Sequence, residues 1–267
     1  MLAAKCHRSF IRILLLLTVI FHVETSAAET QQAIVGVATN FIDTIKTLQT
    51  DFEKSHKGQL IILGGSTGKL YAQISQGAPI DVFLSADQAR PSRLHGEGLA
   101  LESSQFTYAI GQLTVWLPER PMKPKRSALN QEEAIERLRS SSRIAIANET
   151  LAPYGVASVQ FLRSLDLYEE LRPKIVRGEN IGQTFSLISS GNADAGFIAL
   201  TQALAYPEAV KNDDYWPVNE QLHLPIRQDA VLLRRAAKNP VARAFLHYLR
   251  SPAARKIMRE AGYATAD

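Results

Sequence analysis

The chain has 267 residues, a length that suits one large domain or two smaller ones. Hydrophobic residues make up 46% of it and charged residues 21%, which is the composition of an ordinary soluble globular protein. The formal net charge is +4, but half of it lies in the first 28 residues, so the remainder is too weakly basic to favour a nucleic acid partner.

The first 28 residues have the pattern of a secretory signal peptide. A basic segment from Lys5 to Arg12 precedes an apolar run, Ile13–Phe21, and small residues up to Ala28 offer a cleavage site. The nine residues of the apolar run fall short of the roughly 20 that a membrane-spanning helix needs. We therefore expect export to the periplasm, cleavage near Ala28, and a mature chain that does not span the membrane.

The cysteine and histidine positions argue against a redox or metal centre. Cys6, the only cysteine, lies in the predicted signal peptide, so the mature chain would have no disulfide, no thiolate ligand and no cysteine nucleophile. The histidines after that segment show no metal-ligand spacing; they are His56, His95, His223 and His247. We expect no metal held by side chains and no cofactor.

Short apolar runs alternate with amphipathic segments from residue 34 on, which predicts an α/β fold. Ile34–Val37 is the first expected strand. Thr39 and Asn40 follow it as expected helix-capping residues, and apolar side chains at helical spacing then continue to about His56.

The next unit, residues 60–88, reads LIILGGSTGKLYAQISQGAPIDVFLSADQ. Leu60–Leu63 predicts a strand buried on both faces, because it is a continuous apolar run. The glycine-rich turn Gly64–Gly68 then leaves Ser66 and Thr67 at the entry of a helix.

Two strand–turn–helix units in a parallel sheet place their turns side by side at the carboxyl edge of the sheet. Side-chain hydroxyls and amides, together with the free N–H groups and the dipole of a helix N-terminus, form an anion site there. The alternative is that Thr39, Asn40, Ser66 and Thr67 are only helix caps. For any one residue capping is the simpler interpretation, whereas two such turns in one crevice favour a binding site.

The rest of the chain continues with further helices and strands and contains no repeats. Helices are expected at 69–76, 88–98, 130–139, 154–165, 181–189, 240–250 and 252–261, the last two with proline in the first turn. Strands are expected at 82–85, 106–117 in two parts around Gly111, 143–147, 175–176, 195–199 and 226–233. We also expect a surface loop at 118–127, and Asp194 closing a turn.

Gly64–Gly68 also fits G-x-S-x-G, the nucleophile elbow of serine hydrolases, with Ser66 as the nucleophile. Asp194 or Asp229, with His247, would complete the order Ser…Asp…His. An elbow follows several strands, however, and here a single strand precedes it. The motif alone thus leaves a secreted serine hydrolase as the alternative from a different functional class, and the position of the motif in the chain argues against it.

Several segments, taken together, resemble one family. GGSTGKLYAQISQGAPIDVFLSADQ at 64–88 is similar to the signature of the molybdate-binding proteins that feed ABC importers. Other segments match that family in the same order: VATNF at 37–41, SQFTYAIGQLTVW at 104–116, LAPYG at 151–155, GENIGQ at 178–183 and PIRQDAVLL at 225–233. The resemblance covers essentially the whole chain after residue 33.

The resemblance implies the two-lobed fold of type II periplasmic binding proteins, with the ligand in the cleft between the lobes. After the cleaved signal peptide, 1–28, lobe 1 would comprise 29–108 and 229–267, and lobe 2 would comprise 109–228. The strands near 106–110 and 226–233 would cross from one lobe to the other.

The resemblance also implies the ligand contacts, which fall on Thr39, Asn40, Ser66, Thr67, Tyr154 and the backbone N–H of Ile181. A tyrosine in a helix is ordinarily a core residue, but Tyr154 stands at a helix start, which favours a hydroxyl in the cleft. Some members of the family have a serine where this chain has Val37, and a tyrosine where it has Ala199.

The implied function is the binding of molybdate and tungstate outside the cytoplasm, and delivery to the permease and ATPase subunits of an ABC importer. The protein would be a monomer and not an enzyme. Another tetrahedral oxyanion, such as sulfate, is the alternative ligand.

Overall fold

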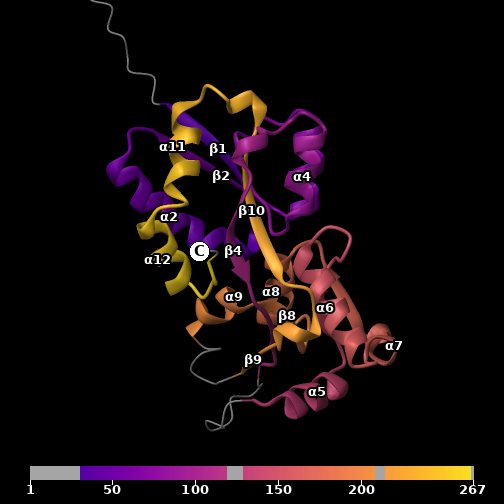
Figure 1. Ribbon diagram of the computed structural model, residues 1–267. Coiled ribbons are helices and arrows are strands. Elements are labelled where there is room, and N and C mark those ends of the chain that lie inside the picture. Colours follow the sequence, from indigo (N-terminus) through magenta and orange to yellow (C-terminus); the bar gives the residue numbers. More distant parts are fainter. Residues whose placement is uncertain (1–30, 119–128, 208–213, 266–267) are drawn as a thin grey trace, which may run out of the picture. The chain divides into compact units, whose positions relative to one another are not determined.

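The computed structural model describes residues 31–118, 129–207 and 214–265. The predicted signal peptide with Cys6, and nearly all of the predicted loop at 118–127, lie outside these ranges. The described residues contain two five-stranded mixed sheets with helices packed on them (Figure 1). We call each sheet with its helices a lobe.

The sheet of lobe 1 has the strand order β2-β1-β3-β10-β4. Its strands are β1 (Gln32–Ala38), β2 (Gln59–Gly65), β3 (Val82–Leu84), β4 (Phe106–Gly111) and β10 (Ile226–Leu232). β1 pairs in parallel with β2 and β3, whereas β10 is antiparallel to β3 and β4. The strands predicted at both ends of the chain therefore meet in one sheet.

The prediction that the strand at 60–63 is buried on both faces is wrong. β2 is an edge strand, and Ile61 and Leu63 are 39% and 41% exposed. An apolar run reveals a strand, but its place in the sheet depends on pairing with distant segments, which the run itself does not encode.

Five helices cover this sheet, and apolar residues at helical spacing form their inner faces. They are α2 (Ile42–Ser55), α3 (Thr67–Ser75), α4 (Ala89–Gly96), α11 (Pro240–Tyr248) and α12 (Pro252–Glu260). Figure 1 shows α2, α11 and α12 on one side of the sheet and α4 on the other, in agreement with two separate apolar clusters. Phe52 and Phe245 contact each other edge to face in the larger cluster, while Leu70 and Leu94 lie in the smaller one.

The sheet of lobe 2 has the strand order β7-β6-β8-β5-β9. Its strands are β5 (Leu113–Trp116), β6 (Ile144–Ala147), β7 (Ile175–Gly178), β8 (Ala195–Ala199) and β9 (Tyr215–Pro217). Its helices are α5 (Gln131–Ser140), α6 (Pro153–Ser164), α7 (Tyr168–Leu171), α8 (Ile181–Ser189) and α9 (Leu200–Leu204). The sequence did not predict β9, α7 or α9, because elements of three to five residues are too short to show a period.

Single turns of 3₁₀ helix complete the described elements. They are η1 (Thr39–Phe41), η2 (Glu102–Ser104), η3 (Arg172–Lys174), η4 (Glu220–Leu222) and η5 (Arg234–Ala236). Only η1 bears on the site, because it separates β1 from α2.

Every element of lobe 2 lies between β4 and β10 in the sequence. Lobe 2 is therefore an insertion in lobe 1, and Figure 1 shows β4 and β10 running from the elements of lobe 1 toward those of lobe 2. In the structure β4 reaches Gly111 and β10 starts at Ile226. The lobe boundaries at 108/109 and 228/229 stay a prediction.

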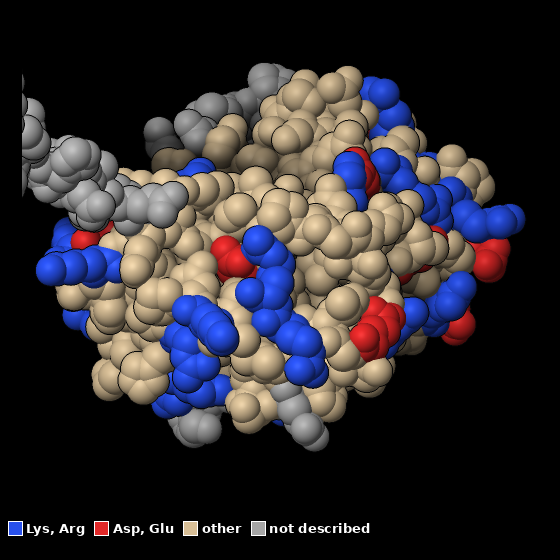
Figure 2. All heavy atoms as spheres, turned by 90° about the horizontal axis from the view of Figure 1, so that it is seen from above, with Lys and Arg blue, Asp and Glu red and all other residues tan. Residues whose placement is uncertain are grey.

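Charged side chains are spread over the surface of lobe 1. Figure 2 shows Lys and Arg side chains across one face, with Asp and Glu side chains among them. Several described ion pairs of this lobe, such as Lys46–Asp43 and Lys256–Glu260, are exposed at both partners, so solvent screens them. Within the described ranges, no helix has both the length and the apolar character that crossing a membrane requires.

Candidate functional site at the junction of the lobes

The ends of β1 and β2 lie side by side. The two strands are parallel, and their register pairs Ala38 with Gly65, so Thr39 and Ser66 leave the sheet at the same edge. This confirms the predicted placement of the two polar turns. We call them the Thr39–Asn40 pair and the Ser66–Thr67 pair.

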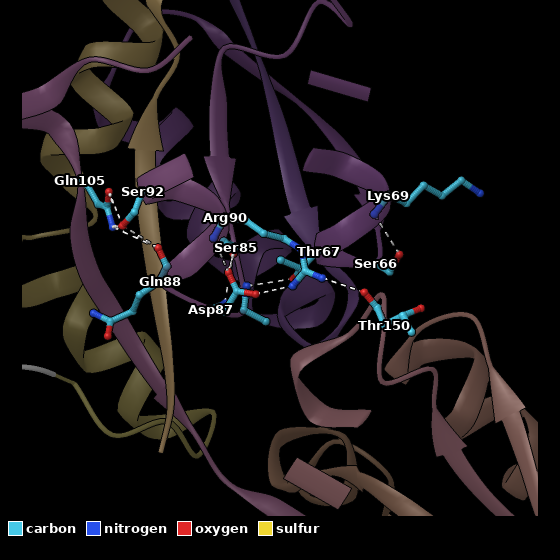
Figure 3. Close-up of polar contacts among 11 residues, drawn as sticks. Ser66, Thr67, Lys69, Ser85, Asp87, Gln88, Arg90, Ser92, Gln105 and Thr150 are labelled. Atoms are coloured by element: carbon cyan, nitrogen blue, oxygen red, sulfur yellow. Dashed lines mark hydrogen bonds and ion pairs between the residues drawn. The ribbon is translucent and has the colours of Figure 1, made fainter. Parts of the chain in front are cut away.

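The side chains of the Ser66–Thr67 pair form hydrogen bonds within lobe 1. Ser66 is the N-cap of α3, and its Oγ accepts a hydrogen bond from the Lys69 backbone N at 3.3 Å (Figure 3). Thr67 Oγ1 accepts from the Ala86 backbone N at 3.1 Å, which ties the turn to the end of β3. Both side chains are at most 2% exposed. Because both oxygens accept in these contacts, each hydroxyl keeps its proton for a further acceptor.

The Thr39–Asn40 pair does not cap a helix, and that prediction is wrong. The single 3₁₀ turn η1 separates the pair from α2, and neither η1 nor α2 has a side-chain cap. Thr39 Oγ1 instead accepts from the Gly182 backbone N of α8, in lobe 2, at 3.3 Å. Asn40 Nδ2 donates to Gln228 Oε1 at 2.9 Å and to the Tyr263 hydroxyl at 3.0 Å.

Asn40 is 4% exposed, and both of its side-chain amide hydrogens have partners in this arrangement. With this rotamer, the donor that Asn40 can still offer to a ligand is its backbone N–H, which lies in the first turn of η1.

Lobe 2 contributes Tyr154, the second residue of α6. Its ring is buried, with 1% exposed, and its hydroxyl oxygen accepts from Gln228 Nε2 at a long 3.5 Å. Burial, and after it the nearby Tyr263, raise the pKa of the Tyr154 hydroxyl well above its usual value. The hydroxyl is therefore protonated at any physiological pH and acts as a donor.

Ile181 is the first residue of α8 and is 2% exposed. An α-helix leaves the N–H groups of its first turn without intrahelical partners. Asn180 caps this helix by accepting from the Gln183 backbone N at 2.9 Å, and Gly182 N reaches Thr39. Ile181 thus begins a helix whose first turn contacts the Thr39–Asn40 pair through Gly182, and its N–H is one of the first-turn groups.

Further hydrogen bonds hold the two lobes together at the other polar pair. Gly68 N donates to the Leu151 carbonyl at 2.8 Å, and Arg90 donates to the Thr150 carbonyl at 2.9 Å (Figure 3). A Cβ at position 68 would lie 3.1 Å from the Leu151 backbone, so a larger residue there would require a small shift between the lobes. The contacts of Thr39, Asn40 and Gly68 bring the six predicted residues to one junction, where two strand ends meet the starts of α3, α6 and α8.

The six predicted residues offer uncharged donors. Two cations close to the Ser66–Thr67 pair are already paired, Arg90 with Asp87 and Lys69 with Glu179 at 2.8 Å. Hydroxyls and helix N-terminal amides can surround a small anion without a counter-charge. Among the described residues, no three His, Cys, Asp or Glu side chains are grouped so as to hold a metal ion.

Three of the four residues named for the alternative hydrolase have other hydrogen-bond partners. Asp194 does not simply close its own turn, because its carboxylate accepts from the backbone N of Ser142 and Arg143 at 2.9 Å. Asp229 accepts from Thr107 Oγ1 at 2.7 Å, and His247 lies on the exposed side of α11. Among the described residues, the hydrogen-bond partner of Ser66 Oγ is the Lys69 backbone N, and no histidine or carboxylate is bonded to it.

A pocket of about 320 Å³ lies beside Asn40, but its chemistry does not suit an anion. Asp43 and Glu260 are in its lining, together with threonines and apolar residues of α9 and α12. Carboxylates repel an anionic ligand, so this pocket is not the candidate site.

The sequence did not single out Gln228 or Tyr263, although both contact predicted site residues. Gln228 stands between Arg227 and Asp229 in β10, so the sequence does not set it apart; its complete burial appears in the structure. Tyr263 lies just beyond α12 and is not set apart either.

The chain and its fold match a known class of proteins. The family model of the bacterial extracellular solute-binding proteins matches residues 33–264. The periplasmic molybdate-binding protein of Azotobacter vinelandii has a similar solved structure, with a TM-score of 0.78 and 36% identity, covering 88% of this chain and 100% of that one. The predicted two-lobed periplasmic binding protein fold is thereby confirmed.

Relatives of known name narrow the class. The molybdate-binding protein ModA of Azotobacter vinelandii is 37% identical over 238 residues, which cover 89% of this chain and 91% of that protein. ModA of Rhodobacter capsulatus is 36% identical over 234 residues, 88% of each chain. The chain therefore belongs to the ModA family of bacterial extracellular solute-binding proteins.

Proposed function

We propose that this protein is an exported receptor that binds molybdate between its two lobes and delivers it to an ABC importer. The observation that carries the proposal is the convergence of uncharged hydrogen-bond donors from both lobes on one junction. The names of the similar ModA proteins support molybdate as the ligand.

The ligand-binding residues in this proposal are Thr39, Asn40, Ser66, Thr67, Tyr154 and Ile181. A tetrahedral dianion has four oxygens, each of which accepts hydrogen bonds. Hydroxyl protons and first-turn amides from both lobes supply the donors, and a ligand held by both lobes stabilises the closed arrangement. Tungstate has the same charge and the same tetrahedral shape, so we expect it to bind as well.

Sulfate is the second candidate ligand within the same class of site. It has the same charge in a smaller shell, so donors spaced for molybdate would reach its oxygens less well. Protonated oxyanions are disfavoured further, because the junction presents donors, and a protonated oxygen requires an acceptor.

The remaining parts of the proposal follow from the role of a receptor. The protein works in the periplasm as a monomer, and its partners are the permease and the ATPase of the importer. We propose no enzymatic activity, because the similar proteins are named as binding proteins, and no cofactor besides the bound oxyanion.

Titration calorimetry of the mature protein with molybdate, tungstate, sulfate and phosphate tests this function. We expect molybdate and tungstate to bind tightly and sulfate far more weakly, with a rise in melting temperature on adding molybdate. Sulfate binding as tightly as molybdate would overturn the choice of ligand. Covalent labelling of Ser66 by a fluorophosphonate probe would instead support the hydrolase.

A further inference from the structure

Four buried side chains form a chain of hydrogen bonds that leads from lobe 1 to Tyr154 of lobe 2. The Tyr263 hydroxyl lies 2.8 Å from the Asn40 backbone carbonyl, and Asn40 Nδ2 lies 3.0 Å from the Tyr263 oxygen. Asn40 Nδ2 also lies 2.9 Å from Gln228 Oε1, and Gln228 Nε2 lies 3.5 Å from the Tyr154 oxygen. All four residues are at most 4% exposed, so water does not compete for these groups.

The direction of every bond in this chain is fixed by its first member. A carbonyl cannot donate, so Tyr263 must donate its proton to Asn40, and its oxygen must accept from Asn40 Nδ2. The Gln228 atom beside Nδ2 must then be the acceptor Oε1, which the Tyr108 hydroxyl also contacts at 3.1 Å. Gln228 therefore turns its Nε2 toward Tyr154. The Tyr154 oxygen accepts there, and its proton is left for another acceptor.

Gly111 makes room for this arrangement. It is the last residue of β4 and is paired with Ile226 of β10. A Cβ at position 111 would lie 2.1 Å from the Tyr154 hydroxyl oxygen and 2.6 Å from Gln228 Nε2. Any side chain there would displace the hydroxyl, the amide, or both, because atoms cannot approach so closely.

We propose that Gln228 and Gly111 are positioning residues for Tyr154, which seat its hydroxyl so that the proton is directed to the bound oxyanion. The inference rests on the proposed function, because the direction of this proton matters only if Tyr154 is a ligand donor. It also adds a basis for selectivity. Because Gln228 donates to its oxygen, the Tyr154 hydroxyl meets the ligand as a donor, which favours a fully deprotonated oxyanion over hydrogen phosphate.

A double-mutant cycle on molybdate affinity tests the role of Gln228. Gln228→Met keeps the length of the side chain and removes both its donor and its acceptor. We expect it to weaken molybdate binding roughly tenfold or more in the wild-type background, as for the loss of a well-placed donor to a charged group. In a Tyr154→Phe background the same change should weaken binding less than about twofold, because no hydroxyl remains to be positioned.

The matched control is Gln49→Met. Gln49 is a half-buried glutamine of α2 whose amide contacts the Leu60 carbonyl at the far edge of lobe 1. This control should leave molybdate affinity unchanged in both backgrounds.

Gly111→Ala is a second variant that changes no hydrogen-bonding group. We expect it to lower both the molybdate affinity and the melting temperature of the apo protein. Adding Tyr154→Phe removes the nearest of the atoms that the new Cβ would meet, so it should restore part of the melting temperature but not the affinity. Gly96→Ala in α4 is its control, because a Cβ there meets nothing within 4 Å.

The outcomes separate the inference from the function on which it rests. Equal losses of affinity for Gln228→Met in both backgrounds, or equal melting-temperature losses for Gly111→Ala in both, would overturn the positioning role while the receptor function stands. A wild-type protein that fails to bind molybdate would overturn both. Coupled losses at Gln228, with partial rescue of Gly111→Ala by Tyr154→Phe, would establish the proposal.

Discussion

The Thr39–Asn40 pair and the Ser66–Thr67 pair occupy equivalent positions in the fold but form different contacts. Both follow parallel strands that are paired in register, and both precede a helix of lobe 1. Ser66 caps its helix and Thr67 binds the end of β3, so that pair is held within lobe 1. Thr39 and Asn40 cap nothing, and they reach α8, Gln228 and Tyr263 instead.

One turn of 3₁₀ helix accounts for the difference. α3 begins directly after Ser66, so its first-turn N–H groups lie within reach of that side chain. η1 delays the start of α2 to Ile42, which leaves the first pair free to contact lobe 2. A polar pair after a strand therefore serves either its own helix or the opposite lobe, and the length of the turn decides which.

The largest expected effect is at Thr67, where structure and ligand binding depend on the same hydroxyl. Thr67→Val should weaken molybdate roughly ten- to a hundred-fold, because a charge-assisted donor is lost. It should also lower the free energy of unfolding by about 1–3 kcal/mol, since the buried Ala86 N–H loses its acceptor. Thr67→Ser keeps both interactions and serves as the control. Calorimetry and denaturant unfolding measure the two effects, and a loss of stability with unchanged affinity would make Thr67 purely structural.

Alkaline pH should destabilise the part of the junction that contains Asn40 and Tyr154, and it should not affect the Ser66–Thr67 pair. Burial raises the pKa of Tyr154 well above its usual value of about 10. Below pH 10 both the folded and the unfolded states keep the proton, and this contribution to stability is complete. Above pH 10 the unfolded state releases the proton first, so the free energy of unfolding falls as pH rises.

The Tyr154→Phe variant tests this sign. Its free energy of unfolding should decline less steeply above pH 10, by up to about 1.4 kcal/mol per pH unit relative to wild type. Urea unfolding at several pH values between 8 and 11 measures the slope. Parallel slopes would mean that Tyr154 is not buried as described.

Alanine substitutions compare the capping roles of the two pairs directly. Ser66→Ala should lower the free energy of unfolding of the apo protein by about 1 kcal/mol, the usual cost of losing an N-cap. Thr39→Ala should cost about half of that or less, because Thr39 caps no helix and is only half-buried. Denaturant unfolding of the apo protein measures both losses of stability. Equal costs would show that Thr39 supports α2 after all.

The smallest expected effect is that of salt and of pH near neutrality. Affinity for molybdate should change less than about twofold between about 50 and 300 mM salt, because the donors are uncharged and the nearby cations are paired. The affinity for molybdate should also stay constant from pH 6 to 8, because no histidine is among the six candidate residues. His223, which is buried, contacts the Leu224 carbonyl at 2.8 Å. A steep dependence on either variable would place a charged group in the site.

Local signals in the sequence predicted the units that carry the site. The glycine-rich turn with Ser66, the proline at the start of α6 and the apolar runs of β1 and β8 each depend on neighbours close in the chain. Those elements lie where they were expected.

The features that the sequence did not predict depend on distant partners. The edge position of β2 follows from the pairing of β1 with both β2 and β3. The short strand β9 exists because β5 pairs with it. The contact of Asn40 with Gln228 joins residues 188 positions apart, and no local pattern encodes that distance. The candidate site residues were predicted from the family resemblance, whereas Gln228 and Tyr263, which contact Asn40, were not predicted.

An anomalous-difference map from crystals of the mature protein grown with tungstate tests the central claim most directly, because the heavy atom locates the anion without reference to any side chain. The account predicts one strong peak at the junction, within hydrogen-bonding reach through its oxygens of Thr39, Thr67, Tyr154 and the Ile181 N–H. A peak in the pocket beside Asp43 and Glu260, or on the surface cations of lobe 1, would contradict it.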